Sequence, residues 1–378
     1  MARGKDTVPD IPRHEGPPPM LRAGLIGYPA TGKTTLFRLL TRSRDGAGAP
    51  GRQDAQVGVA QVPDPRLDRL TALFEPRRRV PATVELTELA GHGGATTLVD
   101  VAGFRNAHAL VHVLRLFADA RVPHAAGTVD PARDARAMED ELILADLAVT
   151  ERRLERIQQD RKKGSSRELD EEERVIETCQ AALEDGRALR TLELDADDAR
   201  RLRGFSFLSA KPLLVVLNLD EADVADPAGA VERAGLSASL SGAGTEAVPV
   251  CAKIELEIAE LPPEDRAAFL TDLGLEDSGL DRVIRASYHL LGYISFFTVG
   301  TDECRAWSIP DGTPAQEAAG EIHSDIARGF IRAEVVHYDA LTARDGSHAA
   351  CREHGEVRLE GKDYVVRDGD VINFRFAT

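Results

Sequence analysis

One stretch of the 378-residue chain constrains its fold more than any other. It is Gly27–Thr34, which reads Gly-Tyr-Pro-Ala-Thr-Gly-Lys-Thr and satisfies G-x-x-x-x-G-K-[ST] at every fixed position. An apolar run at Leu21–Ile26 precedes it, and a helical pattern at Lys33–Leu40 follows it. This order is typical of a phosphate-binding loop (P-loop) between a strand and a helix. The sequence therefore predicts an α/β nucleotide-binding domain.

The residue types of this loop match the chemistry of a bound phosphate chain. Gly27 and Gly32 allow the backbone to curl so that its amides face phosphate oxygens. Lys33 supplies a point charge for the β and γ phosphates, and Thr34 supplies a hydroxyl ligand for Mg²⁺. We therefore predict Lys33 as a catalytic residue, Mg²⁺ as the cofactor and Thr34 as a metal ligand. The predicted phosphate contacts are Gly27, Tyr28, Pro29, Ala30, Thr31, Gly32, Lys33, Thr34 and Thr35.

Strands and helices alternate along the first third of the chain, which favours a mostly parallel sheet. Further strands are expected at 57–62, 82–89, 110–117, 212–217 and 247–250, and helices at 65–74, 263–273 and 279–291. The proline-rich residues 1–19 are expected to be a disordered tail, with Met20 as a possible natural start. Residues 20–128 and 206–299 are assigned to the nucleotide-binding domain.

Residues 129–205 are predicted to be an inserted antiparallel helical hairpin. Apolar side chains recur at steps of three and four in two runs separated by a polar break at 161–166. The first run comprises Ile143, Leu147, Thr150, Leu154 and Ile157, and the second comprises Glu172, Ile176, Cys179 and Leu183.

Residues 300–378 are predicted to be a small α+β domain. Ile372, Phe374 and Phe376 alternate as on a half-buried strand, and Asp368-Gly369 is a hairpin turn signal.

The base of the nucleotide is expected to contact loops after two later strands. Asn218, Leu219 and Glu221 occupy the positions of the guanine-selective Asn-Lys-x-Asp loop, but Glu221 is one methylene longer than the usual Asp. This change favours ATP over GTP, although Asp220 keeps a GTPase open. Cys251 and Ala252, after the next strand, are expected to contact the base through their backbones.

The composition excludes several other classes of protein. A formal charge of −16 argues against a chain that coats nucleic acid by bulk charge. The four cysteines are widely spaced, as in a reducing compartment. No apolar run approaches the roughly 20 residues of a membrane span. We therefore expect a cytoplasmic protein with no membrane partner.

Several uncommon strings resemble one family. They are Val57–Asp68, Asn218–Glu221, Val248–Leu261, Gly279–Ala286, Arg305–Pro310 and Glu360–Asp370. Together they make the chain similar to the YchF-type, Obg-like ATPases over residues 20–378. The resemblance implies an ATPase with a C-terminal TGS (β-grasp) domain that associates with ribosomes. It also implies RNA contact through the hairpin and the TGS domain.

The chain departs from this family at both switch regions. The loop 42–56 has no Thr to close over Mg²⁺. Where the family reads Asp-Ile-Ala-Gly-Leu, ungapped alignment gives Glu88-Leu-Ala-Gly-His92, so Glu88 becomes the second metal residue. Asp100-Val-Ala-Gly-Phe104 is the alternative position of that motif. His92 is then a candidate for orienting the attacking water, because translation-type GTPases carry a His there.

Three functions follow. The leading hypothesis is a slow ATPase switch that binds the translation machinery. The second is a non-hydrolysing ribosome or RNA adaptor whose switches have decayed, and the third is a GTPase. Basic residues at the hairpin bend (Arg161, Lys162, Lys163 and Arg167) are predicted to meet ribosomal RNA or acidic protein.

Overall fold

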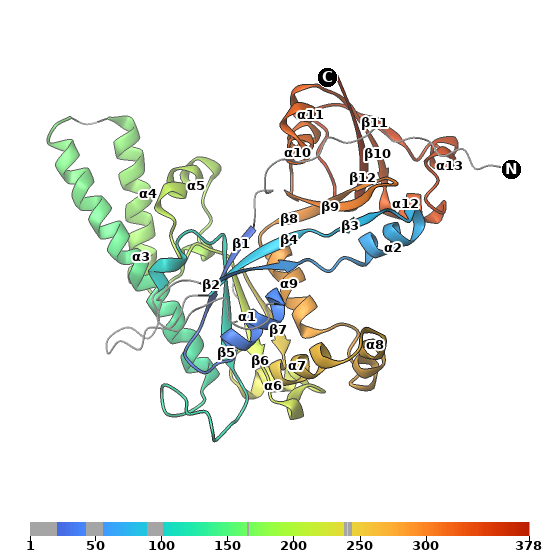
Figure 1. The fold of residues 1–378 in the computed structure, drawn as a ribbon. Helices are drawn as coiled ribbons and strands as arrows, with labels where there is room; N and C mark the ends of the chain where they lie inside the picture. Colours follow the sequence, from blue (N-terminus) through green and yellow to red (C-terminus); the bar gives the residue numbers. More distant parts are fainter. Residues whose placement is uncertain are drawn as a thin grey trace. The chain divides into compact units, whose positions relative to one another are not determined.

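The computed structural model describes residues 21–42, 56–88, 101–164, 166–237, 240 and 244–377. They fall into two units, each built on its own six-stranded sheet (Figure 1). The central unit comprises Arg22–Ala60 and Glu85–Leu291. The C-terminal unit contains Gln61–Val84 and Gly292–Thr378.

The central sheet has the strand order β2-β4-β1-β5-β6-β7. Its strands are β1 (Leu21–Ile26), β2 (Gln56–Gln61), β4 (Thr83–Glu88), β5 (Ala109–Arg115), β6 (Leu213–Asn218) and β7 (Thr245–Val250). β1, β5, β6 and β7 pair in parallel. Every residue of β5 and β6 is buried, as expected of parallel strands covered on both faces. Their carboxyl ends share one edge of the sheet, where the phosphate loop follows β1.

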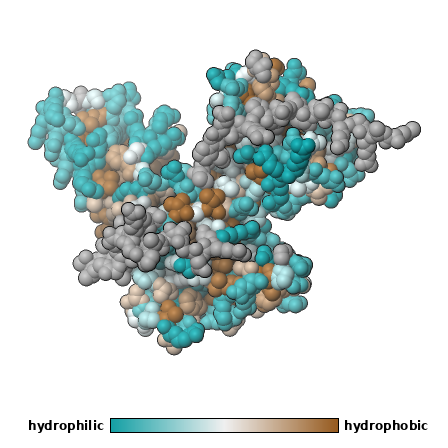
Figure 2. Space-filling view, viewed as in Figure 1, coloured by the Kyte–Doolittle hydropathy of each residue, from teal (hydrophilic) through white to brown (hydrophobic). Residues whose placement is uncertain are grey.

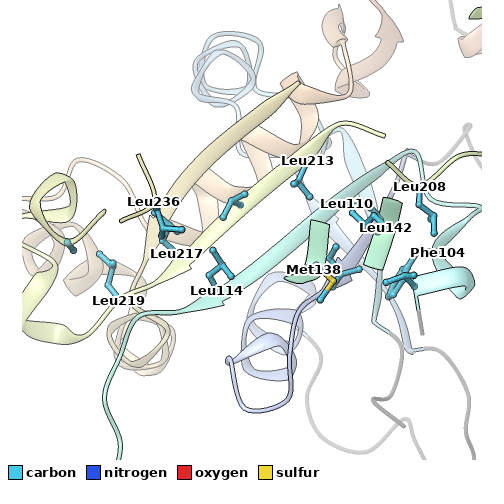
Figure 3. Close-up of a cluster of buried hydrophobic side chains, with 14 residues drawn as sticks. Phe104, Leu110, Leu114, Met138, Leu142, Leu208, Leu213, Leu217, Leu219 and Leu236 are labelled. Atoms are coloured by element: carbon cyan, nitrogen blue, oxygen red, sulfur yellow. The ribbon is translucent and has the colours of Figure 1, made fainter. Parts of the chain in front are cut away.

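Helices cover this sheet. α1 (Lys33–Thr41) contacts both α7 (Ala252–Glu260) and α9 (Gly279–Leu290), and α9 lies on β5, β6 and β7. α3 (Pro131–Arg161) contacts β5 and the short 3₁₀ helix η1 (Val101–Phe104). Met138 and Leu142 of α3 belong to the apolar cluster that includes Leu110 and Leu114 of β5 (Figure 3). The unit also contains α5 (Ala196–Leu202), α6 (Pro227–Arg233) and α8 (Pro263–Asp272).

The predicted hairpin is formed by α3 and α4 (Arg167–Glu184), which contact each other along their length. Asp130 and Ser166 cap the amino ends of α3 and α4 by accepting backbone N–H bonds. A seam of Ile143, Ile176, Cys179 and Leu183 is buried, with Phe207 from the returning chain. Because α3 also covers β5, the hairpin is the continuation of a sheet-covering helix.

The C-terminal sheet has the order β11-β10-β12-β8-β9-β3. Its strands are β3 (Arg78–Val80), β8 (Tyr293–Val299), β9 (Glu303–Pro310), β10 (Phe330–His337), β11 (Arg358–Glu360) and β12 (Asp370–Phe376). Its helices are α2 (Pro65–Phe74), α10 (Ala315–Ile322), α11 (Ser324–Arg328), α12 (Tyr338–Ala343) and α13 (His348–Glu353). β12 lies between β10 and β8, so the last strand of the chain is central in this sheet.

The structure differs from the sequence prediction at two places in this unit. α2 and β3 were assigned with the nucleotide-binding residues, but α2 contacts β8, β9 and α12, and β3 pairs in parallel with β9. The Asp368-Gly369 turn does contain a left-handed glycine, with φ of 87° at Gly369. It is not a hairpin, because β11 and β12 lie on opposite sides of β10.

None of the helices in the described part of the chain is long and apolar enough to cross a membrane.

Candidate phosphate and nucleotide site

The turn between β1 and α1 has the backbone geometry of a phosphate loop. Gly27 and Gly32 have φ of 142° and 95°, where glycine is favoured. A Cβ on Gly27 would lie 2.6 Å from the Val113 carbonyl oxygen, and one on Gly32 would lie 2.4 Å from Asn218 Nδ2. Ala30 also has a positive φ of 62°, which a non-glycine residue adopts at some cost in free energy. The loop is therefore tightly bounded by the ends of β5 and β6.

Lys33 folds back into this loop. Its Nζ donates hydrogen bonds of 2.7 Å to the carbonyl oxygens of Gly27 and Tyr28. Burial lowers the pKa of Lys33 to about 8, and the nearby Glu88 opposes that change. The ammonium group is therefore poorly solvated, so an incoming polyphosphate would be a favourable partner for it.

Thr34 and Glu88 bring two oxygen atoms together beside the loop. Thr34 Oγ1 donates a 2.6 Å hydrogen bond to Glu88 Oε1. Glu88 is 5% exposed, and its Oε2 has no hydrogen-bond partner among the described residues. Hydroxyl and carboxylate oxygens are ligands that Mg²⁺ accepts. The described residues contain no group of three or more His, Cys, Asp and Glu side chains that could hold a metal ion. The site therefore fits a Mg²⁺ ion whose remaining ligands are phosphate oxygens and water.

The two alternatives for the second switch are only partly covered by the structure. His92 and Asp100 both lie outside the described residues. The rest of the second string, Val101–Phe104, forms η1, and its Phe104 ring packs against Gly24 of β1 in the core. Glu88 lies beside Thr34, and the choice between Glu88 and Asp100 stays a prediction.

Asn218 connects the phosphate loop to the second base loop. Its Nδ2 donates to the Thr31 carbonyl oxygen at 3.0 Å, and its Oδ1 accepts the Ala252 backbone N–H at 3.1 Å. Leu219 is 3% exposed and belongs to the apolar cluster of Figure 3. The Leu219 side chain therefore packs in the core, and only its backbone remains as a possible nucleotide contact.

Glu221 and Asp220 have different partners. Glu221 is largely exposed and forms an ion pair with Lys253, next to the base loop. Asp220 Oδ2 accepts the Ala118 backbone N–H at 3.3 Å, so its carboxylate holds the loop after β5. Cys251 is buried at the amino end of α7, and burial raises the pKa of its thiol.

The other predicted loop residues differ in exposure. Pro29 and Ala30 are exposed and Thr35 is half-buried, whereas Tyr28 is buried and offers its carbonyl oxygen to Lys33. Burial raises the pKa of Tyr28, and the carboxylate of Asp134 adds to that shift. Asp134 Oδ2 lies 2.9 Å from Nε2 of the buried His124, a pair that no pattern in the sequence indicates.

Two buried polar residues of β5 were also missed. His112 is buried next to the phosphate loop, and burial, with Lys33 and Arg190, lowers its pKa to about 3. Arg115 is buried at the carboxyl end of the strand. The available signal was two polar residues in the otherwise apolar run Ala109–Leu116, because a polar side chain in a strand buried on both faces needs partners there.

Comparison with known proteins identifies a family to which the chain is similar. Residues 293–377 match the family YchF-GTPase_C, described as a protein of unknown function (DUF933). The chain is 42% identical over 368 residues to the ribosome-binding ATPase YchF of Bacillus subtilis (strain 168), covering 94% of this chain and 99% of that protein. It is 39% identical over 363 residues to the ribosome-binding ATPase YchF of Escherichia coli O157:H7, with the same coverage.

A solved structure matches the whole architecture. The structure titled as the Schizosaccharomyces pombe YchF GTPase has a TM-score of 0.81 and 29% identity, covering 97% of this chain and 100% of that one. The predicted fold class, a P-loop α/β protein with a C-terminal domain, is thereby confirmed.

Proposed function

The chain belongs to the YchF family, and from this membership we propose that it is an ATP-binding P-loop protein that hydrolyses ATP slowly and associates with the ribosome in the cytoplasm. One observation carries the nucleotide part of the proposal: a half-buried Lys33 with a lowered pKa inside a complete phosphate loop, beside the Thr34–Glu88 pair. The ribosomal part rests on what the relatives are named to bind.

In this mechanism the chain's residues bind and align the phosphates. Lys33 exchanges its two carbonyl partners for β- and γ-phosphate oxygens, and the amides at the start of α1 face the same oxygens. Thr34 and Glu88 would hold Mg²⁺, which when bound neutralises phosphate charge. Because phosphoryl transfer depends on alignment and electrostatics, a longer acid at 88 and a first loop without Thr should slow hydrolysis more than binding.

Adenine is the proposed base. Guanine recognition uses a short carboxylate that accepts two hydrogen bonds, whereas Glu221 is longer and already paired with Lys253. Asp220 is the remaining carboxylate of that loop, and the backbone N–H of Ala118 binds it. Both observations weigh against the GTPase alternative.

Calorimetric titration with ATP and GTP, with and without Mg²⁺, tests this proposal. We expect ATP to bind more tightly than GTP, and Lys33→Ala to reduce ATP affinity at least about tenfold. Arg38→Ala is the matched control, because Arg38 is an exposed cation of the same helix. Glu88→Ala should reduce the gain in affinity from Mg²⁺ about tenfold, while Glu85→Ala on the same strand should not. Tighter binding of GTP than of ATP would overturn the adenine assignment.

A measurement of ATP hydrolysis distinguishes this proposal from the alternative of a non-hydrolysing adaptor. The absence of Thr from the loop 42–56 favours the adaptor. We propose on the sequence alone that His92 orients the attacking water. His92→Ala should then lower the rate of phosphate release at least about tenfold and leave ATP affinity nearly unchanged. A wild-type protein that releases no phosphate even with ribosomes present would favour the adaptor.

The proposed ribosome contacts are the hairpin bend and the C-terminal, TGS-like domain. Residues 151–174 contain eight basic and eight acidic side chains, and the hairpin surface in Figure 2 is mainly hydrophilic. Arg161, Lys163 and Arg167 form ion pairs within the hairpin, and Lys162 forms none with any described residue. Lys162 is therefore the cation most available to a phosphate.

Reversing Lys162 and Lys163 to Glu tests this contact. Co-sedimentation with ribosomes should weaken, and the salt dependence of binding should become shallower, because fewer counterions are released. Arg200→Glu, an exposed change on α5 (Ala196–Leu202), is the control. Unchanged co-sedimentation of the reversed variant would remove the bend from the interface.

A further inference from the structure

Arg115 is a buried arginine whose hydrogen-bond partners are backbone carbonyl groups, and its guanidinium lies 4.5 Å from the centre of the Phe117 ring. It is 2% exposed, and it forms no ion pair with any residue in the described part of the chain. Its guanidinium donates to the carbonyl oxygens of Phe117 and Asp119 at 3.2 Å each, of Val122 at 3.0 Å and of Ala30 at 3.5 Å. A buried charge is costly unless something compensates it, so this arrangement needs a reason.

The carboxylates of Asp119 and Asp220 each have another hydrogen-bond partner. The Asp119 carboxylate forms an ion pair of 3.1 Å with Arg121. The Asp220 carboxylate accepts the Ala118 backbone N–H. The dipoles of four carbonyl groups orient the guanidinium but leave its net charge in place, next to the phosphate loop.

Arg115 and Asn218 are register partners at the carboxyl ends of β5 and β6. Asn218 Nδ2 binds the carbonyl oxygen of Thr31, and Arg115 Nη1 lies against the carbonyl oxygen of the preceding residue, Ala30. Two neighbouring strands therefore contact two consecutive carbonyl groups of the loop. In a phosphate loop the amides face the ligand, so contacts that draw the carbonyl groups away from it favour that orientation.

Ala30 is the residue that most needs such support. Its φ of 62° is unfavourable for a residue with a Cβ, and such conformations persist when the surroundings hold them. The contact from Arg115 is long for a hydrogen bond, because the same guanidinium also serves three carbonyl groups of the following loop. Its effect on Ala30 is mainly the attraction between a full charge and a carbonyl dipole.

We propose that Arg115 is a positioning residue of the phosphate site. It holds Ala30 in its left-handed conformation, so that the loop is preformed for a triphosphate, and it adds a buried positive charge behind that loop. This inference rests on the proposed function, since it concerns the same nucleotide site. It assigns to β5 a role in phosphate binding that complements the contact from β6.

Binding of ATP and of adenosine distinguishes this role from a general structural one. Arg115→Met should reduce ATP affinity at least about tenfold and change adenosine affinity less than twofold, because only the phosphates use the loop. Arg115→Lys keeps the charge but not the planar fork, so its ATP affinity should lie between those of the wild type and the methionine variant. Arg105→Met is the control, because Arg105 donates to the backbone carbonyl groups of Ala145 and Ser206 and pairs with Asp146, away from the loop.

Each outcome of these binding experiments supports or contradicts the proposed role of Arg115. An ATP affinity of Arg115→Met within twofold of the wild type, or an equal loss of ATP and adenosine affinity, would overturn the proposal. If the methionine variant does not fold by circular dichroism, the lysine variant decides, and a lysine variant that also fails to fold would assign Arg115 to the fold alone. A wild-type protein that binds no ATP would instead sink the proposed function itself.

Discussion

Burial and ligand binding have opposite effects on the pKa of Lys33. Its ammonium group loses solvation inside the loop and has two carbonyl oxygens as hydrogen-bond partners. A bound polyphosphate would replace those neutral partners with anionic oxygens, which favour the charged form. The pKa of Lys33 should therefore be higher in the complex than in the free protein.

Proton uptake on ATP binding follows from this change. With a free-state pKa of about 8, the protein at pH 8 should take up about half a proton as ATP binds. ATP affinity should be highest below pH 8 and should fall as the pH rises above it. Calorimetry in buffers of different ionisation enthalpy measures the uptake.

Lys33→Ala should abolish this uptake and Arg38→Ala should retain it. Equal uptake by the wild type and Lys33→Ala would mean that another group titrates, or that the phosphates do not reach Lys33.

At the scale of elements, Glu255 joins two helices of the central unit. It lies on α7 and is 3% exposed, and its Oε1 accepts the Gly279 backbone N–H at 2.6 Å at the start of α9. Its Oε2 has no hydrogen-bond partner among the described residues. Burial raises the pKa of Glu255 to about 6, although the amides of Gly279 and Leu280 oppose that shift. The helix junction is therefore held by a carboxylate that is costly to ionise.

Glu255→Gln should stabilise the protein at neutral pH. A raised pKa in the folded state means that the folded protein binds the proton more tightly, so stability is lost as the pH rises from about 4.5 through 6. At pH 7.5 the variant should gain about 1–2 kcal/mol in the free energy of unfolding, because Gln keeps the accepting oxygen without the charge. At pH 4 the gain should vanish.

Urea unfolding followed by circular dichroism at both pH values is the measurement, with the exposed Glu257→Gln on the same helix as the control. A gain that is the same at both pH values would contradict an origin in ionisation.

Elements with strong local signals could be predicted from the sequence, and their assembly could not. β1 and α2 have the predicted bounds, because an apolar run ending at Gly27 and a Pro65 behind an Asp64 cap are local signals. Which sheet α2 covers depends on residues more than 200 positions away, and no local pattern encodes that. The turn at Gly369 was recognised as a turn, but its partner strands depend on the order of the whole sheet.

In the candidate site, too, the local motif could be predicted from the sequence and the contacts between distant residues could not. The phosphate loop was visible as a motif, and the structure brings Thr34 to Glu88 as the alignment suggested. Asn218 was expected at the base, and its contacts with Thr31 and Ala252 make it a connection between two loops. Arg115 was not identified, because its hydrogen-bond partners are backbone carbonyl groups, which no sequence pattern marks.

At the scale of the molecule, the C-terminal unit includes a segment from early in the chain. Leu67 and Leu70 of α2 are fully buried. Arg66 donates to Asp64 and to Asp368, and its guanidinium lies 5.2 Å from the centre of the Phe297 ring. Two of the uncommon strings in the sequence, around 62–68 and 360–370, thus meet in one network. They are separated by about 300 residues but serve one core.

Residues 292–378 alone should therefore not fold stably. Burial of Leu67 and Leu70 contributes about 3–6 kcal/mol, a large share of the stability of a small domain. We expect the isolated fragment to lack a cooperative thermal transition by circular dichroism. The same fragment joined to residues 61–84 by a flexible linker should regain one, and Leu67→Ala in that fusion should weaken it. A cooperative transition in the isolated fragment, at the same temperature as the fusion, would contradict this expectation.

The packing of α2 on the C-terminal sheet also determines when α2 can fold during synthesis. Val84 and Gly292 are 208 positions apart (292 − 84), so α2 waits roughly 10–40 s at ordinary elongation rates before its partners exist. β12, which lies between β10 and β8, is made later still. Until β8 and β9 are made, the apolar face of α2 has no sheet to cover. A nascent chain that stalls between α2 and β8 would leave that face exposed to chaperones and proteases.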